Sequence, residues 1–154
     1  MKSWNARAHE VAYLLNPAFC GRILYIVVKT YGEKINRSFP FPLVYLILPL
    51  VLHEETRKYI NSRTQMLLWV QRYPQLLIDF PKRARELIPI TNESIEFLLQ
   101  TGKVSLTPNG EIEVPASTRS LSKTKFADDE VSECIKKAEH IAKWFAGVGK
   151  VETI

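Results

Sequence analysis

The dipeptide His53-Glu54 invites comparison with a zinc-protease motif. Those enzymes carry H-E-x-x-H on a helix, so that both histidines bind one metal ion from the same face. Here the fifth position is Arg57, and the second ligand is absent. The other histidines, His9 and His140, have no cysteine or carboxylate at metal spacing. Because a zinc site needs three or four suitable ligands, we expect no metal site.

Other catalytic motifs are missing as well. The sequence contains no G-x-S-x-G and no Walker A motif, and Gly147-Val148-Gly149 is not a dinucleotide fingerprint. Cys20 falls in an apolar helical stretch and Cys134 in an amphipathic one. Buried free thiols are the favoured interpretation, with a redox or disulfide role as the alternative. We therefore expect a protein with no catalytic residues and no cofactor of its own.

The best basic cluster could contact phosphate groups of a nucleic acid. It consists of Lys82, Arg83 and Arg85. A solvated helix face with its own ion pairs is the favoured interpretation, and contact with the DNA backbone is the alternative. The expected hairpin nearby carries Glu111 and Glu113 opposite a single lysine. Acidic side chains are repelled by DNA, which favours a protein partner.

Composition and charge agree with one globular domain. The chain has 154 residues, of which 46% are hydrophobic and 24% charged. The net charge of +5 is spread out, with +4 in residues 1–43, zero in 44–116 and +1 in 117–154. DNA-reading domains usually concentrate such an excess on one element. At most an accessory contact with phosphates is expected from charge alone.

The most apolar stretch, Leu43 to Leu52, is too short to span a membrane. It has ten residues and contains Pro49, whereas a spanning helix needs about 20. We expect a core element, or one that a partner covers. No export signal opens the sequence, and a cytoplasmic location is expected.

Hydrophobic periodicity predicts helices along most of the chain. The first is expected at about 5–15, and Asn16-Pro17 ends it, so that Pro17 lies in the first turn of a second, core helix. A loop is expected from Gly32 to Pro42, followed by a bent helix through Pro49 and a helical segment to about Ile60. Later helices are expected to start at Arg63 behind a Ser62/Gln65 capping box, at 79–81 and at Asn92 behind Thr91.

After Gly102 the spacing of the apolar residues changes from that of a helix to the alternation of a strand. Two alternating segments flank the turn Pro108-Asn109-Gly110, which predicts a hairpin over 103–114. The fold class is therefore mainly α with a short β-hairpin, a winged-helix-like domain over 1–114. A linker is expected at 115–127, and an amphipathic docking helix at 128–148 that packs on this domain or on a partner.

Candidate partner-binding residues are aromatic side chains near the two ends of the chain, because tryptophan is enriched at binding hot spots. We select Trp4, Phe19, Trp144 and Phe145 for this reason. Arg7 joins them if the polar face of the first helix meets a partner; otherwise it pairs with Glu10 one turn away. Core and interface are equally favoured for Trp4 and Trp144, and core is favoured for Trp69. The apolar excess of 41–52 and the helix over 128–146 are expected to supply the surfaces.

Three strings in this order resemble one family of small bacterial proteins. They are W-x-x-R-x-x-E-x-x-x-LLNPAFCG from Trp4, LPLVLHEETR at 48–57, and FPKRARELIPITNESIEFLLQTGKVSL at 80–106. The chain is similar to the middle component of three-component ABC systems, the small third subunit of Lamassu-type anti-phage defence complexes. Glu54-Glu55 departs from the Lys/Pro-type residues expected there, which disfavours a DNA contact at this corner.

The resemblance implies a non-catalytic adaptor. Its partners would be an SMC/Rad50-like ABC ATPase, which would hold ATP and Mg²⁺, and an effector, commonly a nuclease. A kleisin-like or winged-helix subunit of this kind would help to keep the effector inactive until foreign DNA is sensed. The alternative is a stand-alone winged-helix DNA-binding regulator.

Overall fold

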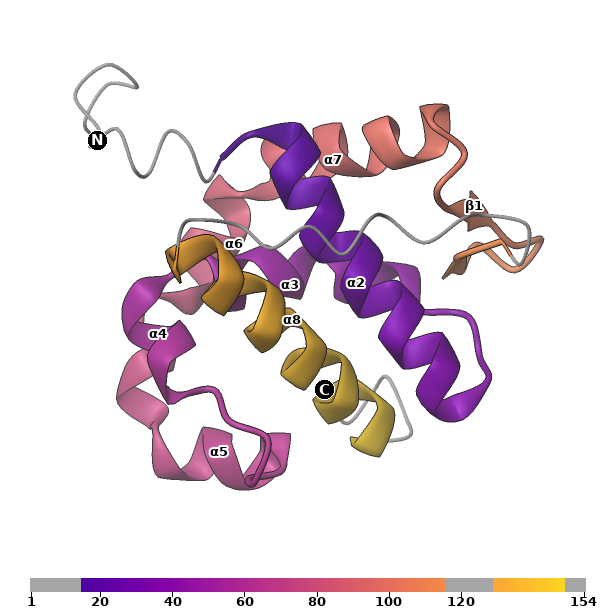
Figure 1. Cartoon of the computed structure of the whole chain (residues 1–154). Helices are drawn as coiled ribbons and strands as arrows, with labels where there is room; N and C mark the ends of the chain where they lie inside the picture. Colours follow the sequence, from indigo (N-terminus) through magenta and orange to yellow (C-terminus); the bar gives the residue numbers. More distant parts are fainter. Residues whose placement is uncertain (1–14, 116–128, 149–154) are drawn as a thin grey trace, which may run out of the picture.

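The computed structural model describes residues 15–115 and 129–148 (Figure 1). Within them the chain is mainly helical and has one antiparallel hairpin, which confirms the expected fold class. The elements, in chain order, are α2 (Pro17–Ile35), the 3-10 turn η2 (Phe41–Leu43), α3 (Val44–Val51), α4 (Glu54–Tyr59), α5 (Met66–Arg72), the 3-10 turn η3 (Pro74–Leu77), α6 (Phe80–Glu86), α7 (Ile88–Gln100), β1 (Ser105–Leu106), β2 (Ile112–Glu113) and α8 (Asp129–Val148).

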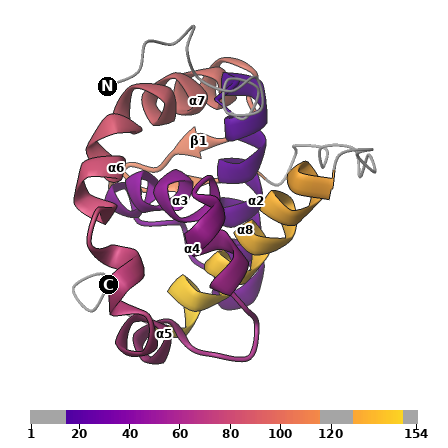
Figure 2. The same ribbon diagram turned by 90° about the vertical axis from the view of Figure 1, so that its left-hand side faces the viewer.

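Helix α2 forms the centre of the molecule. The Asn16 side chain caps it by accepting bonds from the backbone N–H groups of Ala18 and Phe19, at 2.8 and 3.3 Å. Pro17 occupies the first turn, as predicted. Most of the helix is buried, because α7 packs against one part of it and α8 runs beside another (Figures 1 and 2).

The predicted loop from Gly32 begins too early. Helix α2 continues to Ile35 and ends at Asn36, which has a φ of 54° and donates its backbone N–H to the Gly32 carbonyl. Asparagine tolerates this left-handed conformation better than most residues, so it can end a helix as glycine does. Gly32 itself is an ordinary helical residue.

The helical path through Pro49 is confirmed. Helix α3 contains Pro49, and α4 follows it after a two-residue break. Most side chains of α3 are buried, which makes this apolar stretch part of the core of the chain.

Two predicted helix starts are wrong. No helix begins at Arg63, because the Asn61 side chain accepts bonds from the backbone of Arg63 and Thr64, at 3.0 and 2.9 Å, and holds them in a turn. Helix α5 starts at Met66 instead. Thr91 does not cap a helix either, since it lies inside α7 and donates its hydroxyl to the Leu87 carbonyl at 2.7 Å.

The hairpin pairs Ser105 with Glu113 and Leu106 with Ile112. Phe39 adds an unpredicted bridge: its backbone N–H and carbonyl both bond Ile112, at 2.7 and 2.9 Å. The Phe39 ring is buried between Tyr31 and Phe145, with ring centroids 5.0 and 5.8 Å away. The hairpin is therefore joined to the core. The winged-helix assignment stays a prediction.

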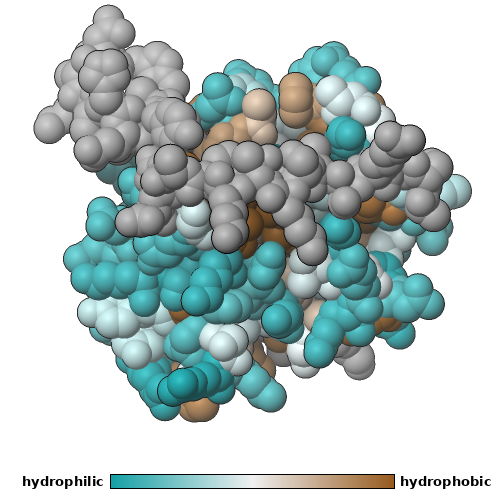
Figure 3. All heavy atoms as spheres, in the orientation of Figure 1, coloured by the Kyte–Doolittle hydropathy of each residue, from teal (hydrophilic) through white to brown (hydrophobic). Residues whose placement is uncertain are grey.

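The closing helix α8 packs on its own chain. Its apolar stripe, from Val131 to Phe145, faces α2, α3 and α5 and is mostly buried. Over α4 and α8 the surface is mostly hydrophilic (Figure 3), as an amphipathic helix requires. The division into residues 1–114, 115–127 and 128–148 stays a prediction, and its linker lies outside the described residues.

Arg57 fastens α8 to the rest of the fold. Its guanidinium is only 1% exposed. Nη1 donates to the Val51 carbonyl at 2.9 Å, Nη2 donates to Glu130 Oε1 at 2.9 Å, and Nε lies 3.6 Å from Glu133 Oε2. Lys137 Nζ adds a bond to the Ile60 carbonyl. These contacts cross between α3–α4 and the first half of α8.

Replacement of Arg57 by alanine should lower the free energy of unfolding by about 3 kcal/mol. Removing one partner of a buried ion pair typically costs about 3–5 kcal/mol, and the lower end applies because Glu130 and Glu133 can still reach water. Urea unfolding followed by circular dichroism measures the loss. Arg63→Ala, at an exposed arginine, is the control. A loss below 1 kcal/mol for Arg57→Ala would contradict this role.

Candidate partner-binding surface

The expected partner-binding residues lie in different environments. Trp144 is 6% exposed and Phe145 2%, so both belong to the core of this chain. Phe19 is half-buried on α2 and packs against the same core. Trp4 and Arg7 lie outside the described residues. The role of these residues in partner binding stays a prediction.

Trp69 and Trp144 meet across α5 and α8. Their ring centroids are 5.1 Å apart, and the Trp69 Nε1–H donates to the Tyr59 carbonyl at 2.8 Å. Trp69 is buried, which confirms the prediction of a core position. This aromatic pair holds α5 against the second half of α8.

An apolar groove opens beside this pair, between α3, α5, α6 and α8. Its volume is about 430 Å³. All eleven lining side chains are apolar, and Trp144 and Phe145 are among them, together with Leu67, Val70 and Phe80. Figure 2 shows α5 and α6 along one edge of the molecule, with α3 and α8 further in. No acidic or basic side chain lines this groove, so it cannot do acid–base chemistry, but it can bind apolar side chains.

The basic cluster on α6 is split by the structure. Arg83 is half-buried, donates Nη2 to Thr56 Oγ1 at 3.3 Å, and lies over the Phe80 ring. Burial lowers its pKa, with Asp79 acting in the opposite direction. Lys82 and Arg85 are exposed and form no salt bridge within the described part of the chain. Only these two remain available for phosphate or for an acidic partner.

His53, the residue that suggested metal chemistry, caps a helix instead. Its Nδ1 accepts the backbone N–H of Thr56 at 3.3 Å and lies 2.8 Å from Thr56 Oγ1. Burial lowers the His53 pKa, and the charge of Arg83 lowers it further. A group of three potential metal ligands is not found among residues 15–115 and 129–148.

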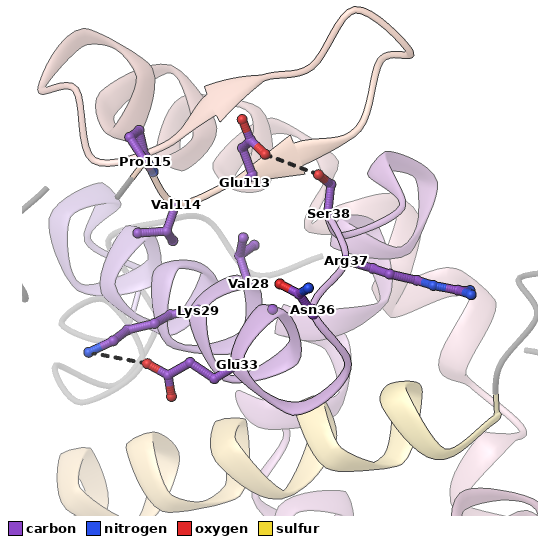
Figure 4. A pocket seen from close by; sticks show the side chains of 10 residues that line it. Val28, Lys29, Glu33, Asn36, Arg37, Ser38, Glu113, Val114 and Pro115 are labelled. Carbon is purple, nitrogen blue, oxygen red and sulfur yellow. Dashed lines mark hydrogen bonds and ion pairs between the residues drawn. The ribbon is translucent and has the colours of Figure 1, made fainter. Parts of the chain in front are cut away.

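A second hollow of about 690 Å³ lies between the end of α2 and strand β2 (Figure 4). Its charged groups are largely paired: Lys29 Nζ is 4.0 Å from Glu33 Oε1, and Ser38 donates to Glu113 at 3.1 Å. The Arg37 side chain extends away from it. With Arg37 directed away, the carboxylates of Glu33 and Glu113 outnumber the single cation Lys29 in this hollow, which disfavours an anionic ligand.

Both cysteines are buried free thiols, as predicted. Burial raises the pKa of Cys20 to about 12, and the neighbouring Cys134 acts in the same direction. A thiol with so high a pKa is not ionised at neutral pH and is a poor nucleophile. Neither cysteine therefore adds catalytic chemistry to this surface.

These observations define a class of protein. In the part that the structure describes, the residues of the polar motifs stabilise the fold, and one of the surface hollows is a groove lined by apolar side chains. None of the described helices is long and apolar enough to cross a membrane. Such an arrangement is typical of a binding subunit.

The sequence matches the family described as ABC-three component (ABC-3C) system Middle Component 3 over residues 4–154. The chain therefore belongs to this family, which confirms the expected middle component. No curated protein and no solved structure matches it. The association with Lamassu-type defence stays a prediction.

The contribution of α5 and η3 to the groove was not predicted from the sequence. A signal was present, because Leu67, Leu68 and Val70 place apolar side chains on different faces of one short helix. A single core can bury only one of those faces. The surplus should have indicated a second apolar contact.

The His53 cap makes stability depend on pH. The fold lowers the His53 pKa below its ordinary value of 6.5, so the unfolded chain takes up a proton first as pH falls. This contribution to stability is therefore fully present well above pH 6.5 and declines as the pH falls through 6.5, because burial and the charge of Arg83 disfavour the imidazolium in the fold. Thermal unfolding at pH 7.5 and 5.5 should show this decline. The decline in stability should be smaller in His53→Asn, because asparagine can cap the helix but has no titratable group. An equal decline in this variant would show that His53 is not its cause.

The two thiols should not react with Ellman's reagent at pH 8 in the native protein. Burial and the raised pKa of Cys20 keep it protonated. Both should react within seconds after addition of guanidinium chloride. Fast labelling of either thiol in the native protein, followed by absorbance at 412 nm, would show that α8 opens readily.

Proposed function

We propose that this middle component is a non-catalytic adaptor. It bridges an SMC/Rad50-like ABC ATPase and an effector, commonly a nuclease, in a bacterial anti-phage defence complex of the cytoplasm. Bound between them, it helps to keep the effector inactive until foreign DNA is sensed. The observation that carries this proposal is the family match over residues 4–154.

The geometry supports a binding role in preference to a catalytic one. His53 and Arg57 are occupied by structural bonds, and Cys20 is buried and protonated. The groove beside Trp144 offers only apolar side chains. In this proposal ATP and Mg²⁺ belong to the ATPase, and the adaptor supplies surfaces.

A tagged copy co-expressed with the neighbouring genes tests the proposal. We expect it to co-purify with the ATPase and the effector, in a complex that survives size-exclusion chromatography and whose mass gives the stoichiometry. Effector activity in the complete complex should be lower than that of the effector alone. A folded protein recovered without either partner would contradict the adaptor role.

DNA binding by the isolated chain is the second candidate. Two observations favour it: the exposed Lys82 and Arg85, and the hairpin joined to the core through Phe39. Glu111 and Glu113 on that hairpin oppose it. A stand-alone regulator would bind DNA with an affinity that falls steeply with salt. If Lys82 and Arg85 contact phosphates, replacing both by alanine should reduce the salt slope by about two.

A further inference from the structure

We propose that the groove between α3, α5, α6 and α8 binds an acidic amphipathic helix from one partner subunit. This inference rests on the proposed adaptor function and names where and how one partner is held. The proposal rests on the side chains that line the groove and on the exposed side chains between Asn61 and Leu87.

Two exposed apolar side chains, Leu67 and Val70, line the groove, and two more, Leu68 on α5 and Ile78 directly after η3, are exposed without lining it. Leu67 is 49% exposed, Leu68 50%, Val70 37% and Ile78 75%. They make up four of the nine large hydrophobic side chains that are exposed in the described residues, and they fall within twelve positions. Apolar surface gathered in this way marks an interaction site.

The groove supplies a fixed floor for such an interaction. The Trp69 indole is held by the Tyr59 carbonyl, and the Trp144 ring packs against it. Leu67 and Val70 extend from this floor to the exposed rim. The volume of about 430 Å³ lies within the range of about 300–1,000 Å³ typical of binding pockets. Large apolar side chains spaced one helical turn apart can insert here.

The secondary structure of the walls favours a helical occupant. Helices α3, α5, α6 and α8 and the turn η3 form the lining, and no strand contributes to it. An extended peptide binds by adding to a free strand edge, which this groove lacks. An amphipathic helix needs only its apolar side chains and no backbone partner.

The surrounding charge favours an acidic occupant. Residues 61–87 contain five basic side chains and two acidic ones. Arg83 is committed to Thr56, but Lys82 and Arg85 are exposed and form no salt bridge in the described residues. Lys82 directly follows Pro81, which lines the groove. A partner helix with acidic residues beside its apolar face would match this rim.

Two other occupants fit less well. Nucleic acid would need basic groups along its path, whereas no charged side chain lines the groove. A second copy could offer Glu93 and Glu96 of α7, which are exposed near Phe97 and Leu99. Membership in a three-component system favours a helix from another subunit over a second copy, and the crosslinks distinguish the two.

Photo-crosslinking tests the position. A benzoyl-phenylalanine is placed at Leu67 or Ile78 of the full chain, which is co-expressed with the ATPase and effector genes. Leu106, 50% exposed on the hairpin, is the matched control. We expect crosslinks from 67 and 78 to one partner segment with acidic and apolar residues at helical spacing. Crosslinks only from 106, or crosslinks to DNA or to a second copy, would overturn the proposal.

Charge and polarity variants test the chemistry. Ile78→Asp and the pair Lys82→Glu with Arg85→Glu change exposed side chains, so folding should be retained and circular dichroism checks it. We expect each to weaken the complex at least tenfold, whereas Leu106→Asp leaves it unchanged. The Lys82/Arg85 variant should also make binding less sensitive to salt.

The outcomes separate this inference from the adaptor function. If the unmodified chain forms no complex, the adaptor function fails and the groove proposal falls with it. If the unmodified chain forms the complex and the Ile78 and Lys82/Arg85 variants retain full affinity, the adaptor function stands and the groove proposal is overturned.

Discussion

A buried guanidinium determines how this small protein is put together. Arg57 has almost no contact with water, and a buried charge is stable only when its partners are in place. One partner is the Val51 carbonyl at the end of α3, and the others are Glu130 and Glu133 on α8. The contacts of Arg57 with Glu130 and Glu133 therefore fix the position of α8 along the core. Because Trp144 lies further along the same helix, the shape of the groove depends on an ion pair at the opposite end of α8.

The residues of the sequence strings that resemble the family have structural roles in this fold. In LPLVLHEETR, His53 caps α4, the Thr56 hydroxyl lies between His53 and Arg83, and Arg57 is the buried cation. In LLNPAFCG, the Asn16 side chain caps the N-terminus of α2, Pro17 is the first residue of that helix, and Cys20 is buried in the core. Residues that resemble parts of a catalytic site thus position helices. A family can be recognised by strings of this kind, since the fold needs them.

Periodicity and turn residues predicted much of this fold. The apolar stripes indicated α2 and α8, and Pro108-Asn109-Gly110 indicated the hairpin. Helix starts were predicted less well, because Asn61 competes for backbone N–H groups that a capping box would use. The partner-binding residues stay a prediction, and the groove was not predicted as a whole. Trp144 and Phe145 were selected, but the groove also needs α3, α5 and α6, whose meeting is a tertiary event that local patterns do not encode.

The segments that line the groove lie far apart in the sequence, and this has a consequence for folding during synthesis. Most of the groove comes from residues 46–81, but its inner wall includes Trp144 and Phe145. Arg57 meets Glu130 across 73 positions of sequence. A ribosome therefore releases α2 to α7 before the helix that completes both the ion pair and the groove. A nascent chain exposes the apolar faces of α2 and α3 without offering the finished surface, so the groove is complete only in chains in which α8 has been made.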